Sequence, residues 1–210
     1  MMIIAIDGPA ASGKSSIARK IAAHYRLPHL DTGSLYRAVA RDVLRSGGDL
    51  NDPYSAAKAA RGLDPASLSD PDLRVKGYGE AASIVAAIGD VRQALLQFQR
   101  DFARRPEGAV IEGRDIGTVV CADADAKLFL TATPESRARR RYLELRGYGM
   151  DITEERVLEE IKERDRRDMT RAVSPLRKAD DAHLLDTTEL DIEKAFLAAV
   201  KLIDAVYVSR

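Results

Sequence analysis

The strongest chemical signal in the sequence lies in residues 8–15, which read Gly-Pro-Ala-Ala-Ser-Gly-Lys-Ser. They fit the pattern G-x-x-x-x-G-K-[ST], in which a glycine-rich loop surrounds phosphate oxygens with backbone N–H groups. A short apolar run precedes the loop and a segment of helical character follows it, as the pattern requires. The loop therefore predicts that the chain binds the phosphates of a nucleoside triphosphate, and its context disfavours an ordinary glycine-rich turn.

The residue types in this loop suit that chemistry. Gly8 and Gly13 allow the backbone to turn tightly enough to aim successive N–H groups at one anion. Lys14 is long enough to reach the outer phosphates, and the Ser15 hydroxyl stands where a magnesium ligand is expected. The predicted phosphate-binding residues are Gly8, Pro9, Ala10, Ala11, Ser12, Gly13, Lys14, Ser15 and Ser16.

Dispersed arginines predict a second anion site that faces the loop. Phosphoryl transfer needs positive groups around the developing charge, and an acceptor that is itself a phosphate adds further negative charge. Arg164, Asp168 and Arg171 recur at helical spacing, so they share one helical face that could hold a phosphate and a sugar hydroxyl. The candidate arginines lie in separate segments and are Arg37, Arg92, Arg114, Arg164 and Arg171.

A structural alternative stays open for the arginines of residues 137–171, because this stretch is almost equally rich in acidic residues. Such helices are often solvated and carry surface ion pairs that contribute little to stability. The functional interpretation is a mobile lid that brings guanidinium groups onto the transferred phosphoryl group. The same choice applies to Arg137, Arg139, Arg140 and Arg141.

The elements that must position these residues alternate between short apolar strands and helices. This order predicts an α/β fold of three layers, with a central parallel sheet between helices. Ligands of such sheets lie beyond the carboxyl ends of the strands, and the phosphate loop, residues 31–33 and residues 113–115 each follow a predicted strand directly. The five predicted strands are Ile3–Asp7, Pro28–Asp31, Ala109–Glu112, Lys127–Thr131 and Ala182–Asp186.

Two stretches are expected to leave this core. Residues 47–79 are rich in Gly, Pro, Asp and Ser, so we expect an insertion of loose structure with only a short helix near residues 55–61. Residues 134–170 predict two charged helices on either side of a Gly-Tyr-Gly hinge at residues 147–149. The second stretch therefore predicts a helical hairpin that is able to move.

Weaker patterns place two more helix features. Asp151 and Glu154 form a weak capping box for the second helix of the hairpin. Residues 191–206 predict a structural helix packed on the sheet. Its expected buried positions are Phe196, Val200, Ile203 and Val206.

The composition describes one compact unit, so a single domain over residues 1–210 is expected. The 33 basic and 33 acidic residues cancel, which argues against nucleic-acid or membrane partners. Cys121 is the single cysteine and has no histidine near it in the sequence, so neither a disulfide nor metal-ligand spacing is expected. We expect a cytoplasmic protein with neither an export signal nor a membrane span.

Three further motifs follow the phosphate loop in order along the chain. They are Asp31-Thr32-Gly33-Ser34-Leu35-Tyr36-Arg37, then Gly113-Arg114-Asp115-Ile116-Gly117-Thr118, then Glu163-Arg164-Asp165-Arg166-Arg167-Asp168 with Arg171-Ala172-Val173-Ser174-Pro175-Leu176. Together with the loop they extend over nearly the whole chain and resemble the bacterial cytidylate kinase family.

The resemblance implies an ATP-dependent cytoplasmic kinase that phosphorylates CMP and dCMP with Mg²⁺. A monomer is expected, with a monophosphate-binding insertion over about residues 47–90 and a helical lid over about residues 137–165. The resemblance assigns Thr32, Tyr36, Arg37, Arg114 and Arg171 to the acceptor phosphate, Ser83, Arg92 and Asp115 to the cytosine ring, and Arg164 and Asp168 to the ribose. It makes Lys14, Arg137, Arg140 and Arg141 the groups that stabilise charge on the transferred phosphoryl group.

The sequence departs from the family in its short insertion. Residues 63–79 show little β pattern where many members have several antiparallel strands, which leaves the selection among CMP, dCMP and UMP open. Either Glu112 or Asp31 is expected to hold a water of the Mg²⁺ shell. Another small P-loop kinase with a different acceptor, or a nucleotide-binding regulator without turnover, stays open as an alternative.

Overall fold

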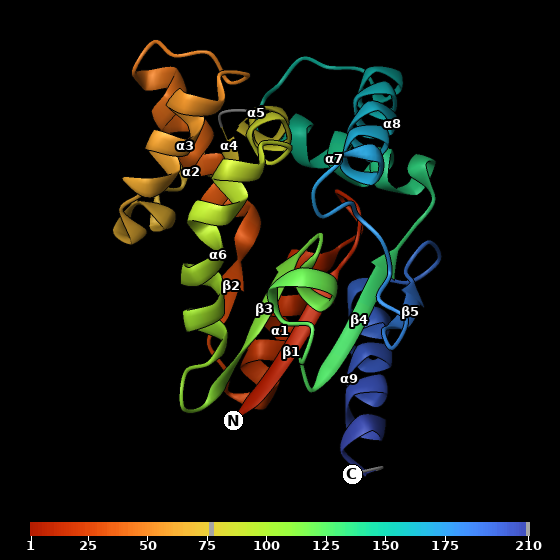
Figure 1. Ribbon diagram of the computed structural model, residues 1–210. Helices are drawn as coiled ribbons and strands as arrows, with labels where there is room; N and C mark the ends of the chain where they lie inside the picture. Colours follow the sequence, from red (N-terminus) through yellow and green to blue (C-terminus); the bar gives the residue numbers. More distant parts are fainter. Residues whose placement is uncertain (76–77, 209–210) are drawn as a thin grey trace.

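The structure, a computed structural model, describes residues 1–75 and 78–208 and is built around one parallel sheet (Figure 1). Its strands lie in the order β2-β3-β1-β4-β5, and each pairing is parallel. All five predicted strands are present, which confirms the prediction of an α/β fold. The strands are β1 (Met2–Asp7), β2 (His29–Asp31), β3 (Gly108–Gly113), β4 (Ala126–Thr131) and β5 (His183–Asp186).

Helices cover both faces of the sheet and give the three predicted layers. The helices against the sheet are α1 (Lys14–Tyr25), α2 (Thr32–Arg45), α6 (Gly89–Ala103) and α9 (Ile192–Val208). In β1, Ile3 and Ala5 pack in one core with α2 and α6, whereas Ile4 and Ile6 pack in a second core with α1 and α9. Because strand residues alternate between faces, a continuously apolar strand supplies both cores.

The register of the sheet brings the predicted site segments to one edge. Asp7 at the end of β1 lies opposite Gly113 of β3 and Phe129 of β4. The phosphate loop therefore leaves the sheet beside the turn that follows β3. Gly8 makes this exit possible, because its φ is +150° and a Cβ atom there would lie 2.0 Å from the carbonyl O of Leu130.

The insertion between α2 and α6 is more helical than its composition predicts. The short helix predicted near residues 55–61 is present, but the prediction of loose structure for the rest of the segment is wrong, because its Asp-Pro pairs begin helical turns. Asp52 accepts hydrogen bonds from the backbone N–H groups of Tyr54 and Ser55, and Asp64 accepts one from Ala66. Residues 76–77 of this stretch lie outside the described residues. Its elements are α3 (Pro53–Arg61), a 3-10 turn (Pro65–Ser69), α4 (Asp72–Val75) and α5 (Tyr78–Val85).

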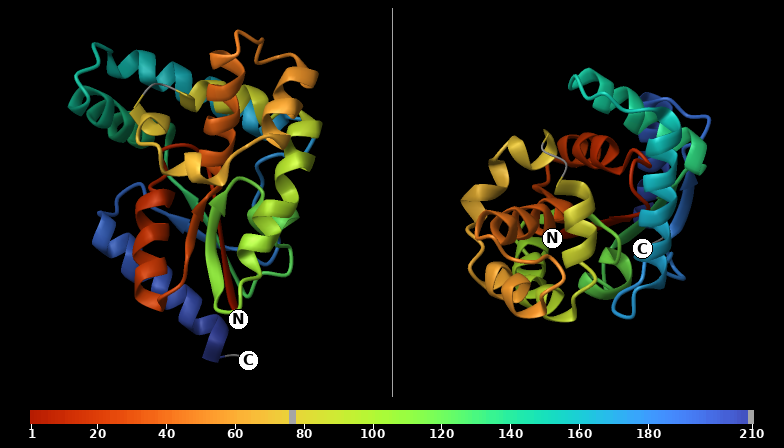
Figure 2. Two further views of the ribbon diagram at one scale, coloured as in Figure 1. Left: turned by 90° about the vertical axis from the view of Figure 1, so that its left-hand side faces the viewer. Right: turned by 90° about the horizontal axis from the view of Figure 1, so that it is seen from above.

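The predicted helical hairpin is present as α7 (Pro134–Gly147) and α8 (Glu154–Thr170). Val157 and Ile161 of α8 are buried in a small core together with Leu145 of α7. Seen from above in Figure 2, α7 and α8 lie on one side of the molecule and the helices of the insertion on the other.

The start of α8 differs from the predicted capping box. Thr153 precedes the first helical residue, and its hydroxyl oxygen accepts a hydrogen bond from the backbone N–H of Arg156 at 3.2 Å. Asp151 lies farther from the helix and instead pairs with Arg146 at 3.4 Å. The capping prediction is therefore wrong by two residues, because the helix is capped by Thr153, and threonine is also a favourable N-cap residue.

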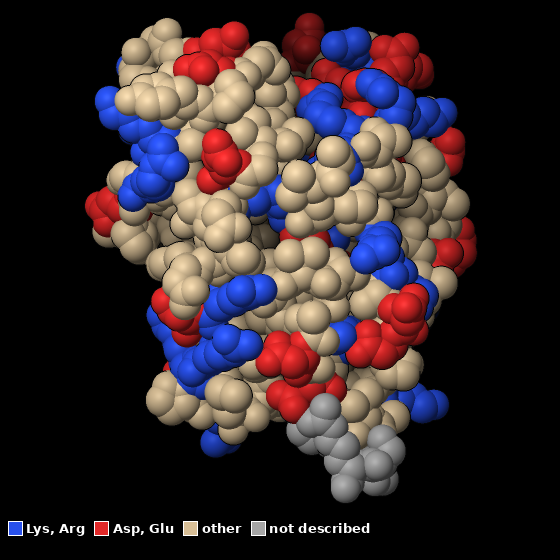
Figure 3. Space-filling view, viewed as in Figure 1, with Lys and Arg blue, Asp and Glu red and all other residues tan. Residues whose placement is uncertain are grey.

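Charges of both signs are interspersed over the face of the molecule shown in Figure 3. Such a mixed surface agrees with the balanced composition. Among the described residues, no helix combines the length and the apolar character that crossing a bilayer requires.

The C-terminal helix α9 is predicted correctly, but some of the residues that it buries differ from the predicted ones. Ala195, Ala199 and Ile203 are buried, whereas Phe196 and Val200 are only partly covered. Alanines bring the helix close to the sheet, because they add little bulk at the contact.

The variant Ile203→Ala should lower the free energy of unfolding by about 2–5 kcal/mol, because it opens a cavity in a fully buried position. The matched control is Leu197→Ala on the same helix, whose side chain is exposed and which should change stability by less than about 0.5 kcal/mol. Urea unfolding of both variants measures the difference. Equal losses in the two variants would contradict the packing described for α9.

Candidate active site

A cavity of about 760 Å³ lies at the carboxyl ends of the strands, between the phosphate loop, the insertion and the helical hairpin. It brings together most residues of both predicted sites. Gly8, Pro9 and Arg137 are predicted site residues that do not line it. The predicted residues in its wall are Ala10, Ala11, Ser12, Gly13, Lys14, Ser15, Ser16, Thr32, Tyr36, Arg37, Ser83, Arg92, Arg114, Asp115, Arg140, Arg141, Arg164, Asp168 and Arg171.

Lys14 is the first residue of α1, and its side chain reaches back to the start of the phosphate loop. Gly13, with a φ of +87°, turns the chain into the helix, and Lys14 Nζ donates a hydrogen bond to the carbonyl O of Pro9 at 2.8 Å. Burial, together with the nearby positive charge of Arg114, lowers the pKa of Lys14 to about 7. A phosphate placed at the loop would favour the ammonium form again, because an opposite charge raises the pKa of an amine.

Oxygen donors suited to Mg²⁺ lie beside the loop. Ser15 Oγ donates a hydrogen bond to Glu112 Oε2 at 2.8 Å, and the other carboxylate oxygen lies 3.0 Å from His29 Nε2. A hydroxyl and a buried carboxylate fit an ion that prefers hard oxygen ligands and takes few of them from protein. His29 therefore contacts a candidate site residue. Asp31, the other predicted carboxylate, pairs with Arg37 at 2.6 Å.

Asp168 joins three elements at one end of the cavity. Its Oδ1 accepts a hydrogen bond from Ser83 Oγ on α5 at 2.9 Å, and its Oδ2 accepts one from Arg114 Nε, after β3, at 3.0 Å. Arg164, one turn earlier on α8, lies 3.9 Å from Oδ2. Burial by itself would raise the pKa of Asp168, but Arg114 and Arg164 hold it below its usual value. The carboxylate is therefore charged at neutral pH.

Asp115 is the centre of a second buried cluster. Its Oδ2 accepts a hydrogen bond from the Arg92 guanidinium, and Arg171 Nη2 lies 3.8 Å from its Oδ1. Arg92 also lies over the ring of Tyr36, 5.5 Å from its centroid. Burial raises the pKa of Tyr36, so its hydroxyl stays neutral and can donate a hydrogen bond. The cluster therefore presents both donors and an acceptor in a dry part of the cavity.

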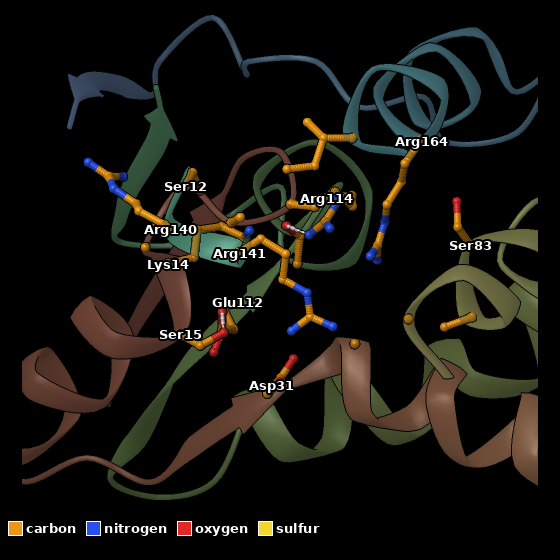
Figure 4. A pocket seen from close by; sticks show the side chains of 18 of the residues that line it. Ser12, Lys14, Ser15, Asp31, Ser83, Glu112, Arg114, Arg140, Arg141 and Arg164 are labelled. Atoms are coloured by element: carbon orange, nitrogen blue, oxygen red, sulfur yellow. Dashed lines mark hydrogen bonds between the residues drawn. The ribbon is translucent and has the colours of Figure 1, made fainter. Parts of the chain in front are cut away.

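The three lid arginines differ in what they touch. Arg141 points into the cavity in the direction of Asp31, whereas Arg140 turns away from it in Figure 4. Arg140 Nη1 donates a hydrogen bond to Thr187 Oγ1 at 3.1 Å, and Arg141 Nη1 donates one to Glu144 at 2.7 Å. Both line the cavity, and only Arg141 is aimed at its centre.

Arg137, a predicted charge-stabilising residue, does not line the cavity. It is 3% exposed, and its guanidinium donates to both carboxylate oxygens of Asp165 at 3.0 and 2.6 Å. It also donates to the carbonyl O of Ala10 at 3.2 Å and to that of Ala132 at 2.9 Å. With these partners Arg137 joins α7 to α8 and to the phosphate loop, instead of facing the cavity.

The family model for cytidylate kinase matches residues 4–205. The chain belongs to the cytidylate kinase family. It is 56% identical to a cytidylate kinase of Methylocella silvestris over 98% of this chain and 95% of that protein. It is 58% identical to one of Xanthobacter autotrophicus over 97% of this chain and 98% of that protein. The resemblance seen in the sequence motifs is therefore confirmed.

The fold of this cytidylate kinase family member also occurs outside the family. A gluconokinase structure from Sinorhizobium meliloti 1021 is similar with a TM-score of 0.52 and 14% identity, covering 99% of this chain and 97% of that one. At this identity the likeness concerns the fold alone.

Sequence reasoning missed the part of the cavity that follows β5. Thr187, Leu190, Asp191, Ile192 and Ala195 line it. Thr187 Oγ1 lies 3.1 Å from the carbonyl O of Ser12, so this segment touches the phosphate loop. The signal was present, because the segment follows the carboxyl end of a strand just as the other site segments do.

ATP binding should be coupled to proton uptake by Lys14. In the free protein its pKa is about 7, and the phosphates should raise it, so the protein takes up a proton on binding above pH 7. The affinity for ATP should therefore fall as the pH rises above 7. Calorimetry at pH 8 in buffers of different ionisation enthalpy measures the uptake. The control is Lys14→Arg, which stays protonated and should show no uptake; equal uptake in both proteins would contradict this origin.

Proposed function

We propose that the chain transfers the γ-phosphoryl group of ATP to CMP and dCMP, with CDP or dCDP and ADP as products. The observation that carries this proposal is the cavity of about 760 Å³, in which the phosphate loop faces two clusters of arginines around buried carboxylates. Membership of the cytidylate kinase family supports the choice of acceptor. The two clusters give an acceptor nucleotide a charged site for its phosphate and polar groups for its base.

On the donor side, the loop of residues 8–16 would bind the phosphates through its backbone N–H groups and Lys14. Mg²⁺ would be held at the Ser15 hydroxyl, with Glu112 in contact with its water shell, and would neutralise phosphate charge. Arg141, which points into the cavity, is the lid arginine best placed to face the transferred group. The roles of Arg137 and Arg140 in direct contact with that group remain predictions.

On the acceptor side, the cytosine ring would lie against Asp115, Arg92 and Ser83. The exocyclic amine of cytosine donates to carboxylate and hydroxyl oxygens, and its ring nitrogen and carbonyl accept from a guanidinium group. Ser83 donates its hydrogen to Asp168, so its oxygen lone pairs are available to accept.

The remaining acceptor groups would hold the sugar and the phosphate. Arg164 and Asp168 would bind the ribose. The acceptor phosphate would lie among Thr32, Tyr36, Arg37, Arg114 and Arg171. No general base is required, because the attacking phosphate oxygen is already anionic at neutral pH. The protein would supply alignment, charge neutralisation and exclusion of water.

We further propose that residues 1–210 act as one kinase domain, with the segment of residues 47–90 against the acceptor and the lid over the donor. The contact between α5 and α8 through Ser83 and Asp168 supports this arrangement, because it joins the two appendages across the cavity. We expect the protein to act as a cytoplasmic monomer without nucleic-acid or membrane partners.

ADP production with ATP and Mg²⁺ should be stimulated strongly by CMP and dCMP and weakly by UMP or AMP. A coupled assay with each acceptor at matched concentration measures this preference. Lys14→Ala is the control, since loss of a phosphate-directed charge in a dry site should reduce turnover by about 100-fold or more. Stimulation by none of the four nucleotides would refute the proposed function.

Asp115→Asn should change the preference between pyrimidines. The amide places an N–H donor where cytosine also offers a donor, whereas uracil offers a carbonyl there. We expect kcat/KM to fall by about 10- to 100-fold for CMP and to change little for UMP, which corresponds to roughly 1–3 kcal/mol. The control is Asp123→Asn on the surface, which should affect neither substrate. Equal losses on CMP and UMP would remove Asp115 from base recognition.

A further inference from the structure

Asp7 is a buried carboxylate that the proposed mechanism does not use. It ends β1 and directly precedes the phosphate loop, yet it does not line the cavity. Its side chain points to the turn after β3 instead. Oδ1 accepts a hydrogen bond from the backbone N–H of Ile116 at 2.8 Å, and Oδ2 accepts one from that of Gly117 at 2.7 Å.

These two hydrogen bonds fix the position of a turn that lies beyond the end of the strand pairing. The pairing of β1 with β3 ends at Asp7 and Gly113, and the turn of residues 116–120 begins beyond it. Within the turn, the N–H groups of Val119 and Val120 donate to the carbonyl O of Asp115. The first N–H groups of a helical turn have no partner inside the turn, and Asp7 supplies one for each of two.

The turn begins directly after two of the proposed acceptor residues. Arg114 leaves the backbone toward Asp168, and Asp115 leaves it toward Arg92. A small rotation of the turn would therefore move both side chains at once, one at each buried cluster. The two clusters share this segment of backbone, and Asp7 fixes its position relative to the phosphate loop.

We infer that Asp7 is a positioning residue, whose carboxylate orients the turn that directly follows Arg114 and Asp115 and so aligns the pyrimidine acceptor with the phosphate loop. This inference rests on the proposed function. Only a carboxylate of this length can accept from both N–H groups, because an amide has one oxygen and a donor in place of the other. Burial raises the pKa of Asp7 to about 6, so the side chain is ionised at neutral pH and both oxygens accept.

The test is Asp7→Asn, with KM and kcat measured separately for CMP, UMP and ATP. Misalignment of the acceptor should lower kcat/KM for CMP by about 10- to 100-fold and reduce the preference for CMP over UMP. The KM for ATP should stay within about twofold, because the phosphate loop keeps its own contacts.

A matched control is Asp125, whose carboxylate contacts the other end of β1. Asp125 Oδ2 accepts a hydrogen bond from the backbone N–H of Ile3 at 2.8 Å, far from the cavity wall. Asp125→Asn should lower the midpoint of thermal unfolding as Asp7→Asn does, without changing the CMP-to-UMP preference. Equal effects of the two variants on that preference, or none in Asp7→Asn, would overturn the inference.

A smaller variant covers the case in which Asp7→Asn does not fold. The Asp7→Ser hydroxyl is one bond shorter than the carboxylate, so both hydrogen bonds to the turn are lost, and the same selectivity change is expected. If neither variant folds, Asp7 is required for the fold itself and a specific positioning role is overturned. A wild-type protein that did not phosphorylate CMP would instead contradict the proposed function, which the first assay reveals before any variant is made.

Discussion

Asp115 and Asp168 each lie buried beside two arginines, and the arrangement of the acceptor side depends on these pairings. Guanidinium groups brought together in a dry cavity would repel one another without carboxylates between them. Removal of one partner from such a buried pair costs about 3–5 kcal/mol, because the other charge stays buried without compensation. The carboxylates therefore fix where the arginines lie before any phosphate arrives, and phosphate binding then meets a preorganised positive site.

On the donor side, the positive charge is not paired with a carboxylate. Lys14 has a backbone carbonyl as its hydrogen-bond partner instead. Its lowered pKa shows that burial and Arg114 disfavour the ammonium form. Arginine cannot respond in this way, because it stays protonated at any pH a protein experiences. The site thus combines fixed positive charges around the acceptor with one positive charge at the donor that a phosphate would stabilise.

Much of the fold could be predicted, because buried parallel strands are short apolar runs and site residues follow their carboxyl ends. The positions of Lys14, Arg114 and Asp115 follow from that rule alone. The insertion could not be predicted from composition, since Asp-Pro is compatible with a turn and with a helix start. Contacts between segments that are distant in the sequence could not be predicted either. The residues around His29 do not indicate its contact with Glu112, because the two strands pair only in the folded sheet.

Arg137 shows why spacing does not determine a role. The same helix carries Arg141 into the cavity, while Arg137, one turn earlier, pairs with Asp165. Its bidentate ion pair within the hairpin is strong, because two charge-assisted hydrogen bonds form in a buried place. Its contact with the carbonyl O of Ala10 has one hydrogen bond to a neutral group and is therefore weaker. The contact that joins the two helices of the hairpin is therefore stronger than the contact that Arg137 makes with the phosphate loop.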